Sequence, residues 1–171
     1  MIHIKCPENM SDFVDDGLPA LTTTCFVAGG ITNCPDWQTE FVCMMSDTNV
    51  VFFNPRRESF DITKSLSSKD QIAWEVEHLN RSEVVIFWFP EEGNCMISLF
   101  ELGKTLGKGI PCIVGVEPGY IRALDVFYQL SMLSNQPMYK DLHSVADALH
   151  AYLGYKFNSS THDAWSEEDF K

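Results

Sequence analysis

The sequence predicts one α/β domain built on a parallel β-sheet, and three observations lead to this prediction. Short apolar runs typical of buried strands alternate along the chain with segments of helical periodicity. The clearest run, residues 84–89, is apolar on both faces, as expected of a strand that helices cover on both sides. The chain has 171 residues, which is the usual size of a single domain.

Five strands and five helices are expected between an N-terminal extension, residues 1–22, and an acidic C-terminal tail, residues 155–171. The expected strands are residues 23–28, 49–53, 84–89, 111–116 and 137–139. The expected helices are residues 36–45, a helix that begins at 68, and residues 96–106, 121–133 and 142–153. The domain therefore spans residues 23–154. The polar segment 56–67 is a candidate lid, and the tail is either disordered or docked on a neighbouring subunit.

Charge and cysteine usage restrict the partners of the protein. Twelve basic and 24 acidic residues give a formal net charge of −12, which disfavours nucleic acids and anionic membranes and favours a small substrate. The six cysteines form no C-x-x-C pair, which is typical of reduced thiols and predicts a cytoplasmic protein. No apolar run is long enough for a membrane helix, and no motif indicates a metal or a cofactor.

Glu75 lies on a helix whose apolar stripe is expected at Ile72, Val76 and Leu79. Ser68-x-x-Gln71 has the pattern of a capping box that opens this helix. Glu75 falls on the apolar side, where burial of an unpaired charge is costly. Two interpretations stay open: a residue at the edge of the stripe that reaches solvent, or an acid that lines a pocket.

Glu101 also has two interpretations. Ser98-x-x-Glu101 can be a capping box in which the glutamate only satisfies a backbone amide. Glu101 points away from the expected stripe of Leu99, Leu102 and Leu106. However, it follows the strand 84–89 closely, and open parallel sheets bind ligands at the carboxyl ends of their strands.

Other candidate binding residues also follow expected strands. Gly29 and Gly30 end the first strand and permit close approach of the backbone to a ligand. Arg56 and Arg57 follow the second strand and have the chemistry to hold a phosphate or a nucleobase carbonyl, or to pair with nearby surface acids. The aromatic residues, Trp37 and Trp74 among them, provide either stacking surfaces for a base or ordinary core packing.

The order of several motifs resembles that of the nucleoside 2-deoxyribosyltransferase-like proteins. The matching stretches are FVAGGI at 26–31, CPDWQ at 34–38, NPRR at 54–57, QIAWE at 71–75, FWFPE at 87–91 and SLFELG at 98–103. The resemblance implies a flavodoxin-like three-layer sandwich with a mostly parallel five-stranded sheet. It also implies transfer of a (deoxy)ribosyl group between nucleobases with retention at the anomeric carbon.

The resemblance assigns roles to residues of this sequence. Glu101, in the E-L-G motif, would be the nucleophile that forms a glycosyl-enzyme ester, and Glu75 would protonate the leaving base. The matched motifs would supply the substrate-binding residues, namely Gly29, Gly30, Asp36, Trp37, Asn54, Arg56, Arg57 and Trp74. The sequence departs from the family where Phe26 replaces a tyrosine and Cys95 replaces an aspartate.

Two other functions remain open. If water attacks the glycosyl-enzyme ester in place of a base, the protein is a nucleoside or nucleotide 5′-monophosphate N-glycosidase, with Arg56 and Arg57 as phosphate ligands. If the departures at Phe26 and Cys95 abolish turnover, the protein is a nucleotide-binding or sensing protein. In each case the partner is a nucleoside or nucleotide, and the exposed Phe100 predicts a homo-oligomer.

Overall fold

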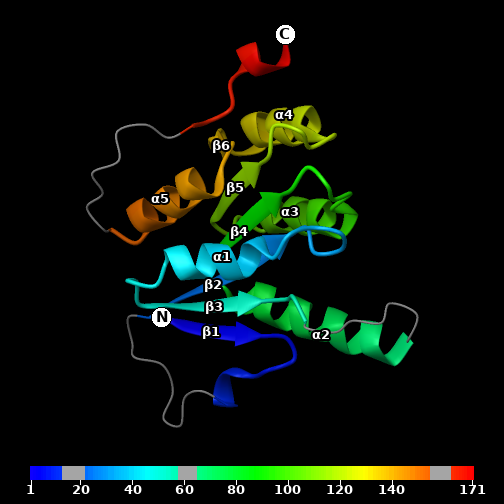
Figure 1. The fold of residues 1–171 in the computed structure, drawn as a ribbon, viewed down its shortest axis with the longest axis vertical. Coiled ribbons are helices and arrows are strands. Elements are labelled where there is room, and N and C mark those ends of the chain that lie inside the picture. The colour runs from blue at the N-terminus through cyan, green and yellow to red at the C-terminus, as the bar shows by residue number, and fades with distance from the viewer. Residues whose placement is uncertain (13–21, 58–64, 155–162) are drawn as a thin grey trace.

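Six parallel strands form one sheet in the order β1-β3-β2-β4-β5-β6 (Figure 1). The computed structural model describes residues 1–12, 22–57, 65–154 and 163–171, without the side chains of 65–67. The strands are β1 (Ile2–Lys5), β2 (Thr23–Gly29), β3 (Val50–Asn54), β4 (Val84–Phe89), β5 (Cys112–Val116) and β6 (Met138–Tyr139). The predicted parallel α/β fold is confirmed, with six strands where the sequence predicted five.

The additional strand comes from the expected N-terminal extension. β1 pairs with β3 from Ile2 opposite Val51 to Lys5 opposite Asn54. This strand has four residues and only one fully buried side chain, Ile4, so its local pattern resembles an irregular segment. It forms because β3 offers it an unpaired edge, which is a property of the sheet rather than of the segment.

Helices cover the sheet on both faces and complete three layers (Figure 1). α1 (Trp37–Met44) and α5 (Leu142–Tyr152) pack on one face, and α2 (Ser65–Arg81), α3 (Met96–Gly107) and α4 (Ala123–Leu133) pack on the other. Alternate strand residues supply the two cores: Phe53 and Phe87 face α2, α3 and α4, whereas Phe52 and Ile86 face α1 and α5. The doubly covered sheet accounts for strands that are apolar on both faces.

The strand order places a topological switch point between β2 and β4. The chain leaves β2 toward α1 on one face and leaves β4 toward α3 on the other face, although the two strands are neighbours. Two adjacent loops therefore diverge at the carboxyl ends of these strands. Open α/β sheets bind ligands in the crevice at such a point.

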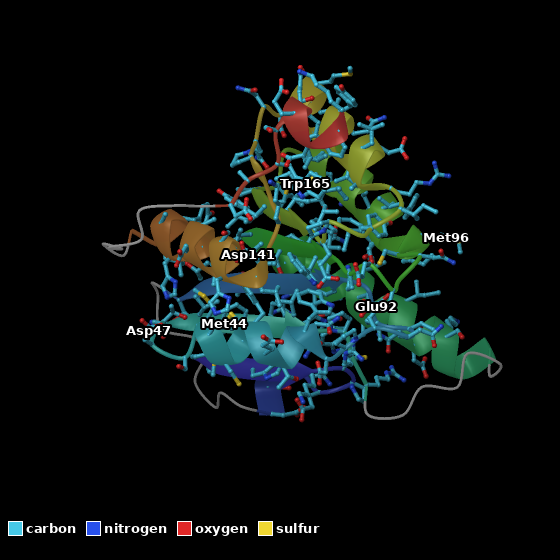
Figure 2. All side chains as sticks on the ribbon, turned by 45° about the horizontal axis from the view of Figure 1, so that its top comes forward. Met44, Asp47, Glu92, Met96, Asp141 and Trp165 are labelled. Carbon is cyan, nitrogen blue, oxygen red and sulfur yellow. The ribbon has the colours of Figure 1, made fainter. Side chains whose placement is uncertain are left out.

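The described part of the C-terminal tail docks on the domain of its own chain. Trp165 donates its backbone N–H to the Met138 carbonyl at 2.7 Å and its ring Nε1–H to the Val116 carbonyl at 2.9 Å. Its ring stacks on Phe170, with 4.8 Å between centroids. Figure 2 shows Trp165 beside α4. Residues 163–171 are therefore ordered against β5, β6 and α4, which differs from the expected disorder or docking on another subunit.

No helix in the described ranges is long and apolar enough to cross a membrane. All six cysteines are free thiols.

Candidate active site

Glu101 lies inside α3 and has no capping role. The helix begins at Met96 with Cys95 as its N-cap, and Ser98 is therefore already within the first turn. The buried side of α3 is centred on Ser98, Leu102 and Thr105, and Glu101 is partly buried at its margin. The capping-box interpretation of Glu101 is therefore wrong. Figure 2 shows Glu92 and Met96 at the loop that leads from β4 into this helix.

Glu75 lies on the side of α2 that faces the sheet. The expected stripe is confirmed at Leu79, which is buried, and is wrong at Ile72 and Val76, which are 58% and 44% exposed. The other buried residues of the described part of α2 are Gln71, Trp74 and His78. Glu75 lies between them at the helical spacing, so its carboxyl group is partly buried.

The predicted capping box at the start of α2 is also wrong. The helix begins at Ser65, one turn earlier than expected, and Gln71 is well inside it. The Gln71 side chain donates from Nε2 to Glu75 Oε1 at 2.7 Å and to the Pro55 carbonyl at 2.8 Å. The residue expected to cap the helix is thus a partner of the candidate acid.

The two carboxyl groups titrate as neighbours. Burial and, to a smaller extent, the negative charge of Glu75 raise the pKa of Glu101 to about 7, and the charge of Lys104 opposes the rise. Burial also raises the pKa of Glu75, against the hydrogen bond from Gln71 and the charge of Arg57. The pair can therefore hold one proton and one negative charge near neutral pH.

Gly29 ends β2 and packs closely against β4, and Gly30 packs the loop after β2 against the loop after β4. Gly29 has φ +152°, and a Cβ atom there would lie 2.1 Å from the Trp88 carbonyl oxygen. A Cβ atom at Gly30 would lie 2.7 Å from Cys34 Sγ and 3.0 Å from Cys95 Sγ. Gly29 thus allows close contact between the ends of β2 and β4, and Gly30 allows close contact between the two loops of the switch point. Contact of either glycine with substrate stays a prediction.

The guanidinium group of Arg56 is occupied by the loop that precedes α1. Arg56 donates from Nε to Gln38 Oε1 at 2.9 Å and from Nη2 to the Pro35 carbonyl at 2.7 Å. Asp36 Oδ1 lies 3.3 Å from Arg56 Nε, and Asp36 is also the N-cap of α1, where it accepts from the Thr39 amide. Arg56 and Asp36 therefore hold this loop in place.

Arg57 points toward the candidate acid rather than toward the Arg56 cluster. Its Nε donates to Cys6 Sγ at 3.1 Å, and its charge lowers the pKa of Glu75. The two adjacent arginines therefore serve different parts of the site.

Three of the expected binding residues are buried supports. Asn54 accepts a hydrogen bond from the Arg56 backbone amide at 2.9 Å and lies against His3. The Trp37 ring is 2% exposed and donates to the Gly30 carbonyl, and the Trp74 ring is 6% exposed and donates to the Glu8 carbonyl. These contacts hold the neighbouring loops in place, and the two tryptophan rings have little exposed surface for a base.

The two residues that depart from the family motif, Phe26 and Cys95, carry no charge. Phe26 is buried in the core, with its ring centroid 6.2 Å from that of Trp74. Burial and the neighbouring Cys34 raise the pKa of the Cys95 thiol to about 12, so Cys95 stays neutral. Neither residue supplies the charge or hydroxyl group that the family carries there.

Sequence reasoning missed Cys6 as a neighbour of the site. The Cys6 thiol donates to Gln71 Oε1 at 3.3 Å across 65 residues of sequence. No local pattern marks such a contact. Within the described residues, no group of three or more His, Cys, Asp or Glu side chains could hold a metal ion.

Comparisons with known proteins agree with the fold and the motifs. The sequence model of the family described as "nucleoside 2-deoxyribosyltransferase like" matches residues 22–120. A solved structure of a 2-deoxyribosyltransferase from Bacillus psychrosaccharolyticus is similar, with a TM-score of 0.56 and 14% identity over 77% of this chain and 96% of that chain. No curated protein sequence matches the chain.

Proposed function

We propose, from the premise that this chain belongs to the nucleoside 2-deoxyribosyltransferase-like family, that it transfers a (deoxy)ribosyl group between nucleobases. Glu101 is the proposed nucleophile and Glu75 the proposed acid. One observation carries the proposal: α2 and α3 bring two partly buried carboxyl groups together beside the switch point of the sheet, and Glu101 has a pKa of about 7.

The proposed reaction has two balanced steps. In the first, a carboxylate oxygen of Glu101 attacks the anomeric carbon, the N-glycosidic bond breaks, and its electron pair goes to the base nitrogen, which takes the Glu75 proton. In the second, the nitrogen of a new base attacks the same carbon, the ester bond to Glu101 breaks, and Glu75 accepts the proton of that nitrogen. Two inversions give overall retention.

A substitution at Glu101 tests this function. Glu101→Gln should lower exchange between a deoxynucleoside and a different free base by orders of magnitude, because an amide neither attacks the anomeric carbon well nor stabilises its positive charge. Glu77→Gln is the matched control, since Glu77 is an exposed carboxylate of α2 that pairs with Arg81. A mass-spectrometric adduct of a 2-fluoro-arabinosyl nucleoside on Glu101 would support the ester. Normal turnover by Glu101→Gln would contradict the proposal.

The substrate is proposed to be a nucleoside rather than a 5′-monophosphate. Arg56, which would be needed for the phosphate, is engaged by Asp36, Gln38 and the loop carbonyls, and its side chain is only 18% exposed. Arg57 is turned toward Cys6. Preferred turnover of a monophosphate over its nucleoside would contradict this part of the proposal.

Hydrolysis and ligand sensing are outcomes of the same assays. Free deoxyribose without an exchanged nucleoside would identify an N-glycosidase, in which water attacks the ester. Ligand binding by calorimetry without cleavage of any deoxynucleoside or monophosphate would identify a binding or sensing protein, as the replacements Phe26 and Cys95 permit. A cytoplasmic location is part of the proposal, and the free thiols support it.

We also propose a homo-oligomer that forms through the outer side of α3 and α4. Large apolar side chains are exposed in these helices, namely Met96, Ile97, Phe100, Met132 and Leu133, and Ile121 is exposed just before α4. A second copy of the chain is the proposed occupant, because a monomer rarely leaves an apolar surface of this kind uncovered. Light scattering should show an oligomer that Phe100→Glu dissociates. A wild-type monomer at working concentration would contradict the proposal.

A further inference from the structure

A directed chain of hydrogen bonds links the N-terminal segment to Glu75. We infer that Cys6 and Gln71 are positioning residues that hold the Glu75 carboxyl group for catalysis, and that β1 is thereby part of the active-site structure. This inference rests on the proposed function, because it assigns a role toward the proposed acid. The residues that carry it lie partly outside the segment 22–120 that the family model matches.

The chain has one consistent direction. Arg57 Nε–H donates to Cys6 Sγ at 3.1 Å, and the Cys6 thiol donates to Gln71 Oε1 at 3.3 Å. Gln71 Nε2 donates to Glu75 Oε1 at 2.7 Å and to the Pro55 carbonyl at 2.8 Å. A carbonyl oxygen only accepts, so the Pro55 contact determines the orientation of the Gln71 amide, and that amide group has only hydrogen-bond donors to offer Glu75.

Sheet register brings Cys6 to this place. β1 runs parallel to β3 and ends opposite Asn54, and the Cys6 amide then donates to the Asn54 carbonyl at 3.0 Å. Cys6 therefore lies beside the Pro55 to Arg57 segment at the carboxyl edge of the sheet. A second contact, from Trp74 Nε1 to the Glu8 carbonyl at 2.8 Å, joins the same N-terminal segment to α2.

Cys6 has the protonation state that its place in the hydrogen-bond chain requires. Burial raises the pKa of the Cys6 thiol, although the hydrogen bond and the charge of Arg57 oppose the rise. The thiol therefore keeps the hydrogen that it donates to Gln71 at neutral pH. Its side chain is 3% exposed, so water does not compete for this contact.

The chain favours the ionised form of Glu75. The charged and titratable groups that face Glu75 are Cys6 from the turn after β1, Arg57 from the loop after β3, and Glu101 from α3. Gln71 and Arg57 lower the pKa of Glu75, whereas burial raises it. The hydrogen-bond chain thus fixes the position of Glu75 Oε1. It also limits the rise in the pKa of Glu75, so that Glu75 can both give and take a proton within one turnover.

Titration of the Glu75 carboxyl group tests the inference without substrate. Carbon-13 NMR of glutamate-labelled protein, with the signal assigned through Glu75→Gln, should show a raised pKa for Glu75 in Gln71→Met, because the hydrogen bond to the ionised form is lost. Cys6→Ala should raise the same pKa less, because Gln71 and its contact with the Pro55 carbonyl remain and only the restraint on Gln71 Oε1 is lost. Cys6→Ser should recover most of the wild-type value, since a hydroxyl group can accept from Arg57 and donate to Gln71.

Cys112→Ala is the matched control. Cys112 is also a buried thiol that faces a glutamine oxygen, Gln136 Oε1 at 3.5 Å, but it begins β5 at the opposite edge of the sheet. Cys112→Ala should lower the free energy of unfolding by about as much as Cys6→Ala does, and it should leave the pKa of Glu75 unchanged. An equal effect of Cys6→Ala and Cys112→Ala on that pKa would overturn the inference, even if Gln71→Met failed to fold.

Exchange kinetics provide the second measurement. Gln71→Met should lower kcat about tenfold to a hundredfold, as expected for loss of a hydrogen bond to a charged group, and Cys6→Ala about threefold to tenfold. The change should fall on kcat more than on KM, with recovery in Cys6→Ser. A wild type without exchange or hydrolysis would remove the proposed function, whereas the titration would still decide whether Cys6 and Gln71 position Glu75.

Discussion

Replacement of Glu101 by glutamine should stabilise the protein at neutral and alkaline pH while it removes activity. Burial raises the pKa of this carboxyl group to about 7 from an ordinary value of 4.5. Because the raised pKa favours the protonated form in the folded state, the stabilisation is complete below about pH 4.5, declines as the pH rises, and is lost above about pH 7. A glutamine at this position does not ionise and avoids that loss.

The expected magnitude follows from the two pKa values. The difference between about 7 and 4.5 corresponds to roughly 3 kcal/mol at about 1.36 kcal/mol for each pH unit. Glu101 is only partly buried, and solvent around its exposed part reduces this value to about 1–3 kcal/mol. Glu101→Gln should therefore match the wild type near pH 4.5 and exceed its stability by about 1–3 kcal/mol near pH 8.

Urea unfolding, followed by circular dichroism across this pH range, measures the difference between variant and wild type. Other titratable groups are present in both proteins, so their effects on the free energy of unfolding largely cancel in that difference. Glu77→Gln is the control, because the Glu77 side chain is 57% exposed and its replacement should give a difference that hardly depends on pH. A difference for Glu101→Gln that also stays constant from about pH 4.5 to about pH 8 would refute the claim that the fold holds this group in an unfavourable charged state.

Three further predictions concern the loops, the tail and the pH profile. Arg56→Ala should lower the free energy of unfolding in urea by about 1–3 kcal/mol, because Asp36, the buried Gln38 side chain and the Pro35 carbonyl lose their partner. It should reduce turnover of a nucleoside and of its monophosphate equally, and a selective loss for the monophosphate would instead identify a phosphate ligand. Trp165→Ala should lower the free energy of unfolding by about 2–3 kcal/mol, and therefore the Tm, through loss of the Phe170 stack and the Val116 hydrogen bond. An unchanged Tm would mean that residues 163–171 do not dock in solution. The proposed exchange rate of the wild type should rise with pH and level off above about pH 7, because Glu101 as the proposed nucleophile must be ionised. A rate that is flat from about pH 5 to about pH 8 would contradict this assignment of Glu101.

The sequence by itself determined five of the six strands and the place where the chemistry is expected. The strand from Val84 to Phe89 could be predicted because a strand buried on both faces needs only apolar side chains, which is a local property. The position of Glu101 after that strand followed from the same reasoning, since ligands bind at the carboxyl ends of parallel strands. Family motifs then indicated the type of reaction.

The tertiary structure alone decided which groups face one another. Ile72 and Val76 have the spacing of a core stripe, yet α2 turns Gln71 and Trp74 toward the sheet, because the shape of the opposing core selects the face of a helix. The same rotation places Glu75 inside the site.

Long-range partners were likewise beyond the reach of the sequence. Arg56 and Arg57 look equivalent in the chain, but one holds Asp36 and the other holds Cys6. β1 forms only because an edge of β3 is available, and it carries Cys6 to Gln71 across 65 residues. Hydrophobic periodicity reports how much of each segment is buried. The identity of the neighbour depends on the arrangement of the whole sheet, and that arrangement brings the two carboxyl groups together.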